Sequence, residues 1–178
     1  MPALRSVLFA LVLGLAGCGS ASTLTEVKPV TSGLGTYQTI AVHVTPAPND
    51  EGGKWSAYFA KELSTRLKDK GVFANVVTDP NGTGDVVLDL KFTKLDIPHG
   101  AATTFAAGSV NANVDLDGTL TKGGSTDSLG TFVVTGNSSH KGRTTVGGFG
   151  VSGPDSYVEA AIEQAASRVT TYFAEKKK

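Results

Sequence analysis

The chain has 178 residues and a formally neutral charge, since 16 lysines and arginines balance 16 aspartates and glutamates. Proteins that bind nucleic acid usually carry an excess or a cluster of basic side chains, so this composition predicts no nucleic-acid partner. The single cysteine excludes an internal disulfide, and stability must therefore come from packing alone.

The start of the chain has the pattern of an export signal. Arg5 precedes an apolar run, Val7–Leu13, and small residues then lead to Cys18. The ten residues Val7–Ala16 would make a helix of about 15 Å, which is half of the ~30 Å hydrocarbon core and too short to span it. We therefore predict a signal peptide over residues 1–17 that is cleaved between Gly17 and Cys18.

The last four residues of this segment, Leu15–Cys18, resemble the lipobox of bacterial lipoproteins. The resemblance implies that Cys18 carries a diacylglyceryl group and an N-acyl chain, and two or more chains hold a protein firmly at a membrane. Cleavage without lipidation is the alternative, but it would leave a free thiol in an oxidising compartment. Gly19 stands where inner-membrane lipoproteins often have aspartate, which favours anchoring in the outer membrane, facing the periplasm.

Residues 18–36 are mostly small and polar, with a proline at position 29. Such a composition is typical of a linker, so we predict a flexible, lipid-anchored tether over residues 18–36. A single globular domain then covers residues 37–178. Within the tether, Thr23–Val30 has an alternative interpretation as an edge strand of the domain.

Alternation of apolar and polar side chains predicts about five strands. In the last three of them one face is apolar, while the other carries asparagine, aspartate, lysine and threonine side chains. Turn-forming residues separate the strands, among them Asp79–Gly84 and Lys122–Ser125. The strands are expected at residues 37–44, 72–78, 86–97, 110–117 and 129–137.

Residues 53–70 and 154–174 have the spacing of amphipathic helices. In the first of them, large apolar side chains recur at every fourth position: Trp55, Phe59, Leu63 and Leu67. Because the last three strands are apolar on one face only, both helices should cover that face. We predict an α+β fold, a two-layer sandwich with two helices on one face of a mixed, mostly antiparallel sheet, in the order β-α-β-β-β-β-α.

A resemblance to a known family rests on three segments and on a glycine-rich stretch before the last helix. The segments are Thr39–Val42, Gly84–Leu90 and Gly108–Leu116. From Tyr37 onward the chain resembles a group of bacterial envelope lipoproteins that share the domain of unknown function DUF4410. The resemblance implies an exported domain without known catalytic residues.

Two short motifs resemble ligand-binding loops. Gly148–Gly153 spells G-x-G-x-x-G before the last helix, but no parallel strand follows that helix, so a loop is the better interpretation. Asn113–Gly118 resembles the first half of a calcium loop, but Gly124 stands where the bidentate glutamate should be. The alternation in Asn113–Gly118 favours a strand with one solvated face.

No residue set predicts catalysis, cofactor binding or metal binding. His43, His99 and His140 are isolated, and the chain lacks both the H-x-x-x-H spacing of zinc sites and the G-x-S-x-G motif of serine hydrolases. Phe105 and Phe149 are large apolar residues in segments without periodicity. If both segments lie at one end of the sheet, we expect these two side chains to contact a partner or the membrane.

Together these observations predict a membrane-anchored envelope lipoprotein that is not an enzyme. Its domain would contact other envelope proteins, or a second copy of itself, through a sheet edge and the glycine-rich loops. A binding module for a small ligand or an envelope polymer is the alternative. An exposed sheet edge would favour the first hypothesis, and a deep pocket with convergent polar groups the second.

Overall fold

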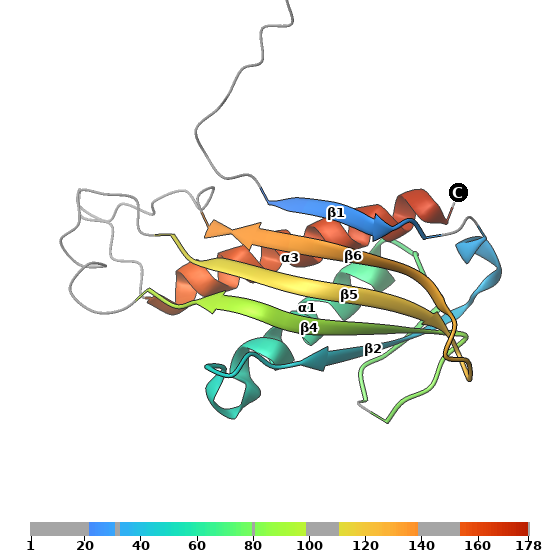
Figure 1. The fold of residues 1–178 in the computed structure, drawn as a ribbon, viewed down its shortest axis with the longest axis horizontal. Helices are drawn as coiled ribbons and strands as arrows, with labels where there is room; N and C mark the ends of the chain where they lie inside the picture. The colour runs from blue at the N-terminus through green and yellow to red at the C-terminus, as the bar shows by residue number, and fades with distance from the viewer. Residues whose placement is uncertain (1–21, 31–32, 80, 99–110, 139–153, 178) are drawn as a thin grey trace, which may run out of the picture.

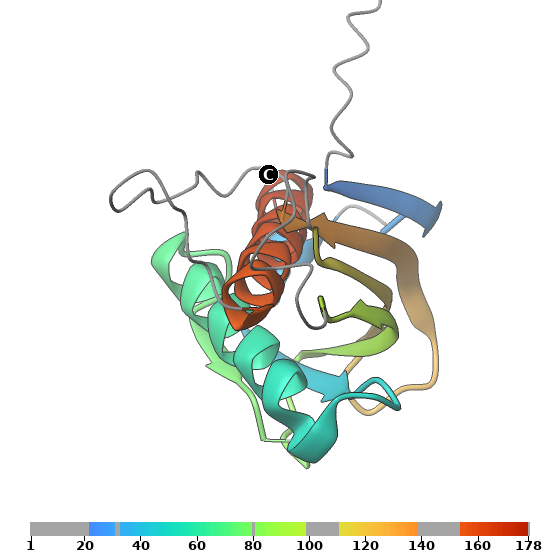
Figure 2. The same cartoon turned by 90° about the vertical axis from the view of Figure 1, so that its left-hand side faces the viewer.

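The structure, a computed structural model, describes residues 22–30, 33–79, 81–98, 111–138 and 154–177. They form a curved six-stranded sheet with two long helices on its concave face (Figures 1 and 2). The strands are β1 (Thr23–Lys28), β2 (Thr39–Thr45), β3 (Asn75–Val77), β4 (Val86–Asp96), β5 (Asn113–Lys122) and β6 (Ser128–Asn137). The helices are α1 (Lys54–Asp69) and α3 (Pro154–Lys176), with 3-10 turns η1 (Leu34–Thr36) and η2 (Glu51–Gly53).

The sheet is mixed and open, with the strand order β1-β6-β5-β4-β2-β3. β4, β5 and β6 form an antiparallel meander, and β1 pairs antiparallel with β6. β2 pairs parallel with both β3 and β4, and α1 makes the connection between β2 and β3. The predicted α+β sandwich with two helices on one face is therefore confirmed, with six strands where about five were expected.

Both helices bury the stripes that the sequence predicts. The α1 residues spaced four apart are all buried, and Phe59 packs edge-on against Phe92 of β4 with ring centroids 5.7 Å apart. From α3, Phe173 packs against Phe132 of β6 at 6.0 Å. The core is thus one layer of aromatic and aliphatic side chains between the helices and the meander. Among the described residues, no helix combines the length and the apolar character that crossing a membrane requires.

The ends of α1 are set by residues outside its apolar stripe. At its start, the Asp50 carboxylate accepts hydrogen bonds from the backbone N–H groups of Trp55 (2.9 Å) and Ser56 (2.8 Å), which have no partners within the helix. At its end, Gly71 adopts a positive φ of 60°, a conformation that glycine tolerates better than other residues. The helix predicted over residues 53–70 is therefore observed as Lys54–Asp69, with Gly71 just after its end.

The prediction of a flexible tether over residues 18–36 is wrong for its described part. Thr23–Lys28 is β1, which extends the sheet beyond β6, and both Val30 and Leu34 are buried in the core. The alternative, an edge strand within Thr23–Val30, is the one observed. The polar composition was misleading because β1 is held by partners that lie more than a hundred residues away in the sequence.

One polar cluster fastens β1 to the last helix. The Tyr172 hydroxyl donates to Glu26 Oε1 (2.6 Å), and Lys176 Nζ lies 2.7 Å from the same oxygen. The Val30 N–H donates to the Tyr172 hydroxyl at 3.4 Å. The hydrogen bonds from Lys176 and Tyr172 lower the pKa of the Glu26 carboxyl below its ordinary value of 4.5. β1 is therefore anchored to α3 by charge as well as to β6 by its backbone.

Gly118 of β5 provides the space for an aromatic ring of the neighbouring strand. It lies opposite Phe132 in the β5–β6 pair, and a Cβ at Gly118 would be 2.4 Å from the ring. The ring has no room to move, because Phe132 is 1% exposed and packs against Tyr172 and Phe173. The absence of a side chain at Gly118 is thus a condition of core packing.

We expect Gly118→Ala to lower the free energy of unfolding by about 1–3 kcal/mol, the usual effect of overpacking a filled core. Urea denaturation followed by circular dichroism measures it. Asp117→Ala is the control, since Asp117 is exposed on the other face of the same strand and should change stability by no more than about 0.5 kcal/mol. Equal values for the two variants would contradict this account of Gly118.

The Glu26 cluster makes the attachment of β1 dependent on pH. A carboxyl with a lowered pKa stabilises the fold above its ordinary value, and this contribution is lost as the pH falls through the lowered pKa. At pH 7, Glu26→Gln should therefore reduce the hydrogen-exchange protection of the β1 amides. The difference from the wild type should shrink toward pH 3, because the wild-type carboxyl becomes protonated as the pH falls through its lowered pKa.

Hydrogen exchange with mass spectrometry at both pH values checks this, after correction for intrinsic exchange rates. Glu51→Gln in η2 is the control, because Glu51 is exposed and distant in sequence from β1 and α3. A Glu26→Gln effect of equal size at pH 7 and pH 3 would show that the charge on Glu26 does not hold β1.

Candidate functional site

The face of the sheet opposite the helices is the candidate functional surface. Both helices lie on the concave side, and no described element packs over the meander on the convex side (Figure 2). Alternation along β4, β5 and β6 directs polar side chains to this side, which we call the open face. Its members include Asp89, Lys91, Asp115, Asp117, Thr119 and Thr131.

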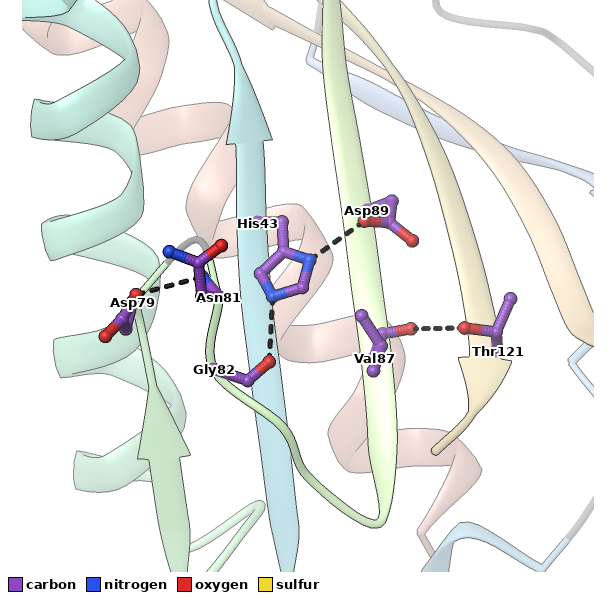
Figure 3. A network of polar contacts seen from close by, with 7 residues as sticks. All are labelled: His43, Asp79, Asn81, Gly82, Val87, Asp89 and Thr121. Carbon is purple, nitrogen blue, oxygen red and sulfur yellow. Dashed lines mark hydrogen bonds and ion pairs between the residues drawn. The ribbon is translucent and has the colours of Figure 1, made fainter. Parts of the chain in front are cut away.

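A histidine lies on this side of the sheet where the Asp79–Gly84 segment approaches β2 (Figure 3). His43 Nδ1 lies 3.1 Å from Asp89 Oδ1 on β4, and Nε2 lies 3.1 Å from the Gly82 carbonyl oxygen. Both partners are acceptors, so only the doubly protonated ring can donate to both of them. His43 therefore joins three segments: β2, β4 and the loop before β4.

The loop has its own turn structure. The Asp79 side chain accepts a hydrogen bond from the Asn81 N–H (2.9 Å), and the Asp79 carbonyl accepts one from the Gly82 N–H (2.8 Å). Figure 3 shows the Gly82 carbonyl directed at the imidazole. A His–Asp pair of this kind can orient a general base, but here the second ring nitrogen is engaged by a backbone carbonyl, which has no proton to give. The arrangement positions a loop and does not activate a nucleophile.

Acidic side chains gather where β5 begins. Lys94 Nζ pairs with Asp96 Oδ2 at 3.0 Å, which raises the pKa of Lys94. Burial raises the pKa of Asp115, and the nearby carboxylates of Asp96 and Asp117 add to this effect while Lys94 opposes it. The open face is therefore polar with charges of both signs, and it is suited to hydrogen bonding with a polar surface.

Asn113–Gly118, the segment that resembles half of a calcium loop, lies in β5. Asp115 and Asp117 point to the open face, and Leu116 between them is buried. The strand interpretation is confirmed, and an extended strand does not curl its carboxylates around one ion as a calcium loop does. In the part of the chain that the structure describes, no group of three or more His, Cys, Asp or Glu side chains could hold a metal ion.

The sheet ends in two edge strands of unequal length. β3 has three residues, whereas β1 has six and pairs on one side with β6. The β1 register shifts between Glu26 and Lys28, and the Val27 side chain at the shift is 69% exposed. Such a bulge interrupts the pattern of backbone groups that a further strand would pair with. β1 is thus a partly protected edge.

The site residues predicted from sequence lie outside the described residues. These are Gly17, Cys18, Phe105 and Phe149, together with the Gly148–Gly153 motif, His99 and His140. The structure does fix where the two phenylalanine segments leave the sheet. Asp96 pairs with Asn113, and Asn113 pairs with Asn137, so the segments containing Phe105 and Phe149 depart from the same end.

The contact between His43 and Gly82 was not predicted. The alternation in β2 places His43 on the side opposite Ile40 and Val42, which was visible in the sequence. Its partners depend on the parallel pairing of β2 with β4 and on the path of the loop, and neither leaves a local signal.

Comparison with known proteins gives a family and distant structural likenesses. The model of a domain of unknown function, DUF4410, matches residues 21–142. No curated protein matches the chain. The matched span begins just before β1, which agrees with β1 being part of the domain.

Three solved structures illustrate the likeness of fold. A PelC dodecamer from Paraburkholderia phytofirmans is 12% identical with a TM-score of 0.48, and the alignment covers 84% of this chain and 97% of that one. A DUF330 protein from Xanthomonas campestris is 18% identical, with a TM-score of 0.45 and coverage of 82% and 83%. A minor lipoprotein from Acinetobacter baumannii is 12% identical, with a TM-score of 0.39 and coverage of 83% and 94%.

These three likenesses are too distant to carry an argument about binding or assembly. The family match does show a relationship, because it spans most of the chain and includes all six strands and α1. The chain belongs to the DUF4410 family.

Proposed function

We propose that the protein is a bacterial envelope lipoprotein, held by lipid on Cys18 at the outer membrane and facing the periplasm. The lipobox-like Leu15–Cys18 and the absence of any other cysteine in the sequence support this proposal. Residues 1–17 would be the signal peptide. The link between the lipid and the domain would then be short, since the domain has begun by Ser22.

The domain itself would act as a non-enzymatic interaction module. The observation that carries this proposal is the open face, a whole side of the meander that no described element covers. Its charged and hydroxyl side chains match a polar protein surface, and the long β1 edge borders it. The one His–Asp pair on this side is engaged in holding a loop, which accords with a role other than catalysis.

Binding of an envelope polymer is the second candidate. Threonine hydroxyls and aspartate carboxylates lie near one another on the open face of β5 and β6, as at Asp117, Thr119 and Thr131. Groups of these two kinds hydrogen-bond the hydroxyls of sugars. The two candidates differ in what crosslinking would recover from the open face, a protein or a glycan.

Replacing the anchor residue tests the first proposal. In cells that make the full chain, Cys18→Ser should abolish labelling by radioactive palmitate and should move the domain from the membrane fraction to the soluble fraction. Ser20→Ala is the matched control and should leave both readouts unchanged. Palmitate labelling of the Cys18→Ser variant would contradict lipidation at this position.

Phe105 and Phe149, whose segments leave the sheet at the same end, are the proposed contacts. An aromatic anchor in an interface typically contributes about 2 kcal/mol or more. Phe105→Ser combined with Phe149→Ser should therefore reduce in vivo crosslinking to partner proteins or to lipid severalfold. Thr126→Ser, in the β5–β6 turn at the opposite end, is the control. If the double variant kept its crosslinked products at wild-type yield, these residues would not be contacts.

A further inference from the structure

We propose that the domain stands on the membrane on the end of the sheet where β1 begins, with the β5–β6 turn farthest from the lipid. This orientation rests on the proposed lipidation of Cys18. The surface it assigns is the end of the sheet formed by Ser22, Asn113 and Asn137, and its partner is the layer of phospholipid headgroups.

The link between Cys18 and the domain is short. Only residues 19–21 separate Cys18 from Ser22, where the described chain begins. Four Cα–Cα steps reach at most about 14 Å when fully extended. Ser22 must therefore lie within about 14 Å of the residue that carries the lipid.

Ser22 is fixed to the domain. It is 7% exposed, and its Oγ accepts a hydrogen bond from the Asn137 N–H at 3.1 Å. One residue further on, the Thr23 N–H donates to Thr135 Oγ1 at 3.1 Å, and β1 pairs with β6 from this point. The sheet end containing Asn137 thus follows the anchor, and no free linker allows the domain to turn over.

Several strands and both helices also begin or end at the sheet end that contains Asn137. β4 and β6 end here, β5 begins here, and both helices start at the same end (Figure 1). Its charged side chains include two ion pairs: Lys94 with Asp96 at 3.0 Å, and Lys54 at the start of α1 with Asp155 at the start of α3 at 2.5 Å. Each pair presents little net charge to anionic headgroups, and Asp115 adds one carboxylate near Lys94.

The alternative orientation is a domain that lies flat on the membrane with its β1 edge against the lipid. Proteins that lie in the interface do so with an apolar side bordered by basic residues. Within the described residues, Val27 is the exposed large hydrophobic side chain, and its neighbours on β1 are polar or charged. One valine gives little apolar area to hold a sheet edge against lipid, so the upright arrangement is favoured.

The orientation has a geometric consequence. At about 3.4 Å per residue, β5 carries the chain roughly 31 Å from Asn113 to Lys122, away from the membrane. The open face then stands along the membrane normal, where soluble periplasmic partners can reach it. The segments containing Phe105 and Phe149 leave from the end near the lipid.

Energy transfer to the membrane surface tests the orientation. Because Cys18 is the only cysteine and its sulfur would form a thioether with the diacylglyceryl group, an introduced cysteine is a unique site for a fluorescent donor. Pro48→Cys, between the end of β2 and the start of α1, reports the proximal end, and Thr126→Cys, in the β5–β6 turn, reports the distal end. Both positions are exposed. Each full-length, lipidated variant is reconstituted into vesicles of phosphatidylethanolamine and phosphatidylglycerol that carry an acceptor on the headgroup.

We expect transfer from position 48 to exceed transfer from position 126 at least twofold. Equal transfer, or the reverse order, from a protein that floats with the vesicles and contains palmitate would overturn the orientation while leaving the anchor intact. A chain that takes up no palmitate and does not float would overturn the proposed anchor, and the orientation with it. Unlabelled cysteine variants that match the wild-type circular dichroism show that neither substitution disturbs the fold.

Discussion

Every second side chain of β4, β5 and β6 is buried beneath the helices, and most of the architecture follows from this one-sided burial. An apolar face on a three-stranded meander must be covered, and the apolar stripes of α1 and α3 cover it. The side chains on the opposite face are mostly polar, although Val87 and Val133 also point to it. The same alternation that makes the core thus produces the open face.

β1 depends on this core but adds a different kind of interaction. Its side chains are mostly exposed, so hydrophobic burial contributes little to its attachment. The attachment comes instead from backbone pairing with β6 and from Glu26, which joins β1 to Tyr172 and Lys176 of the last helix. The same Tyr172 packs against Phe132 of β6, for which Gly118 leaves space. The edge strand and the core are therefore coupled through one helix.

These physical differences explain which elements the sequence predicted. The meander and both helices have strong periodicity that local pattern reveals, and Gly71 has a turn chemistry that marks a helix end. β1 has neither, since its polar residues resemble a linker until β6 and α3 are in place. For the candidate site, the polar character of the open face was visible in the alternation of β5. The His43–Asp89–Gly82 contact was hidden, because it depends on parallel pairing and on a loop path.

The placement of β1 changes what a lipid on Cys18 would do for the domain. A tether of eighteen residues would let the domain sample a wide volume around its anchor, whereas a link of three residues holds one end of the sheet beside the lipid. A domain held in this way does not search for distant partners, and its partners must come to the membrane or already be there. With a lipidated Cys18, the short link would also fix which surfaces stay accessible, since the end with Ser22 would face the lipid while the open face would not. Restricting orientation in this way lowers the entropic cost of binding at a defined height above the membrane, which suits a module that assembles with other envelope components.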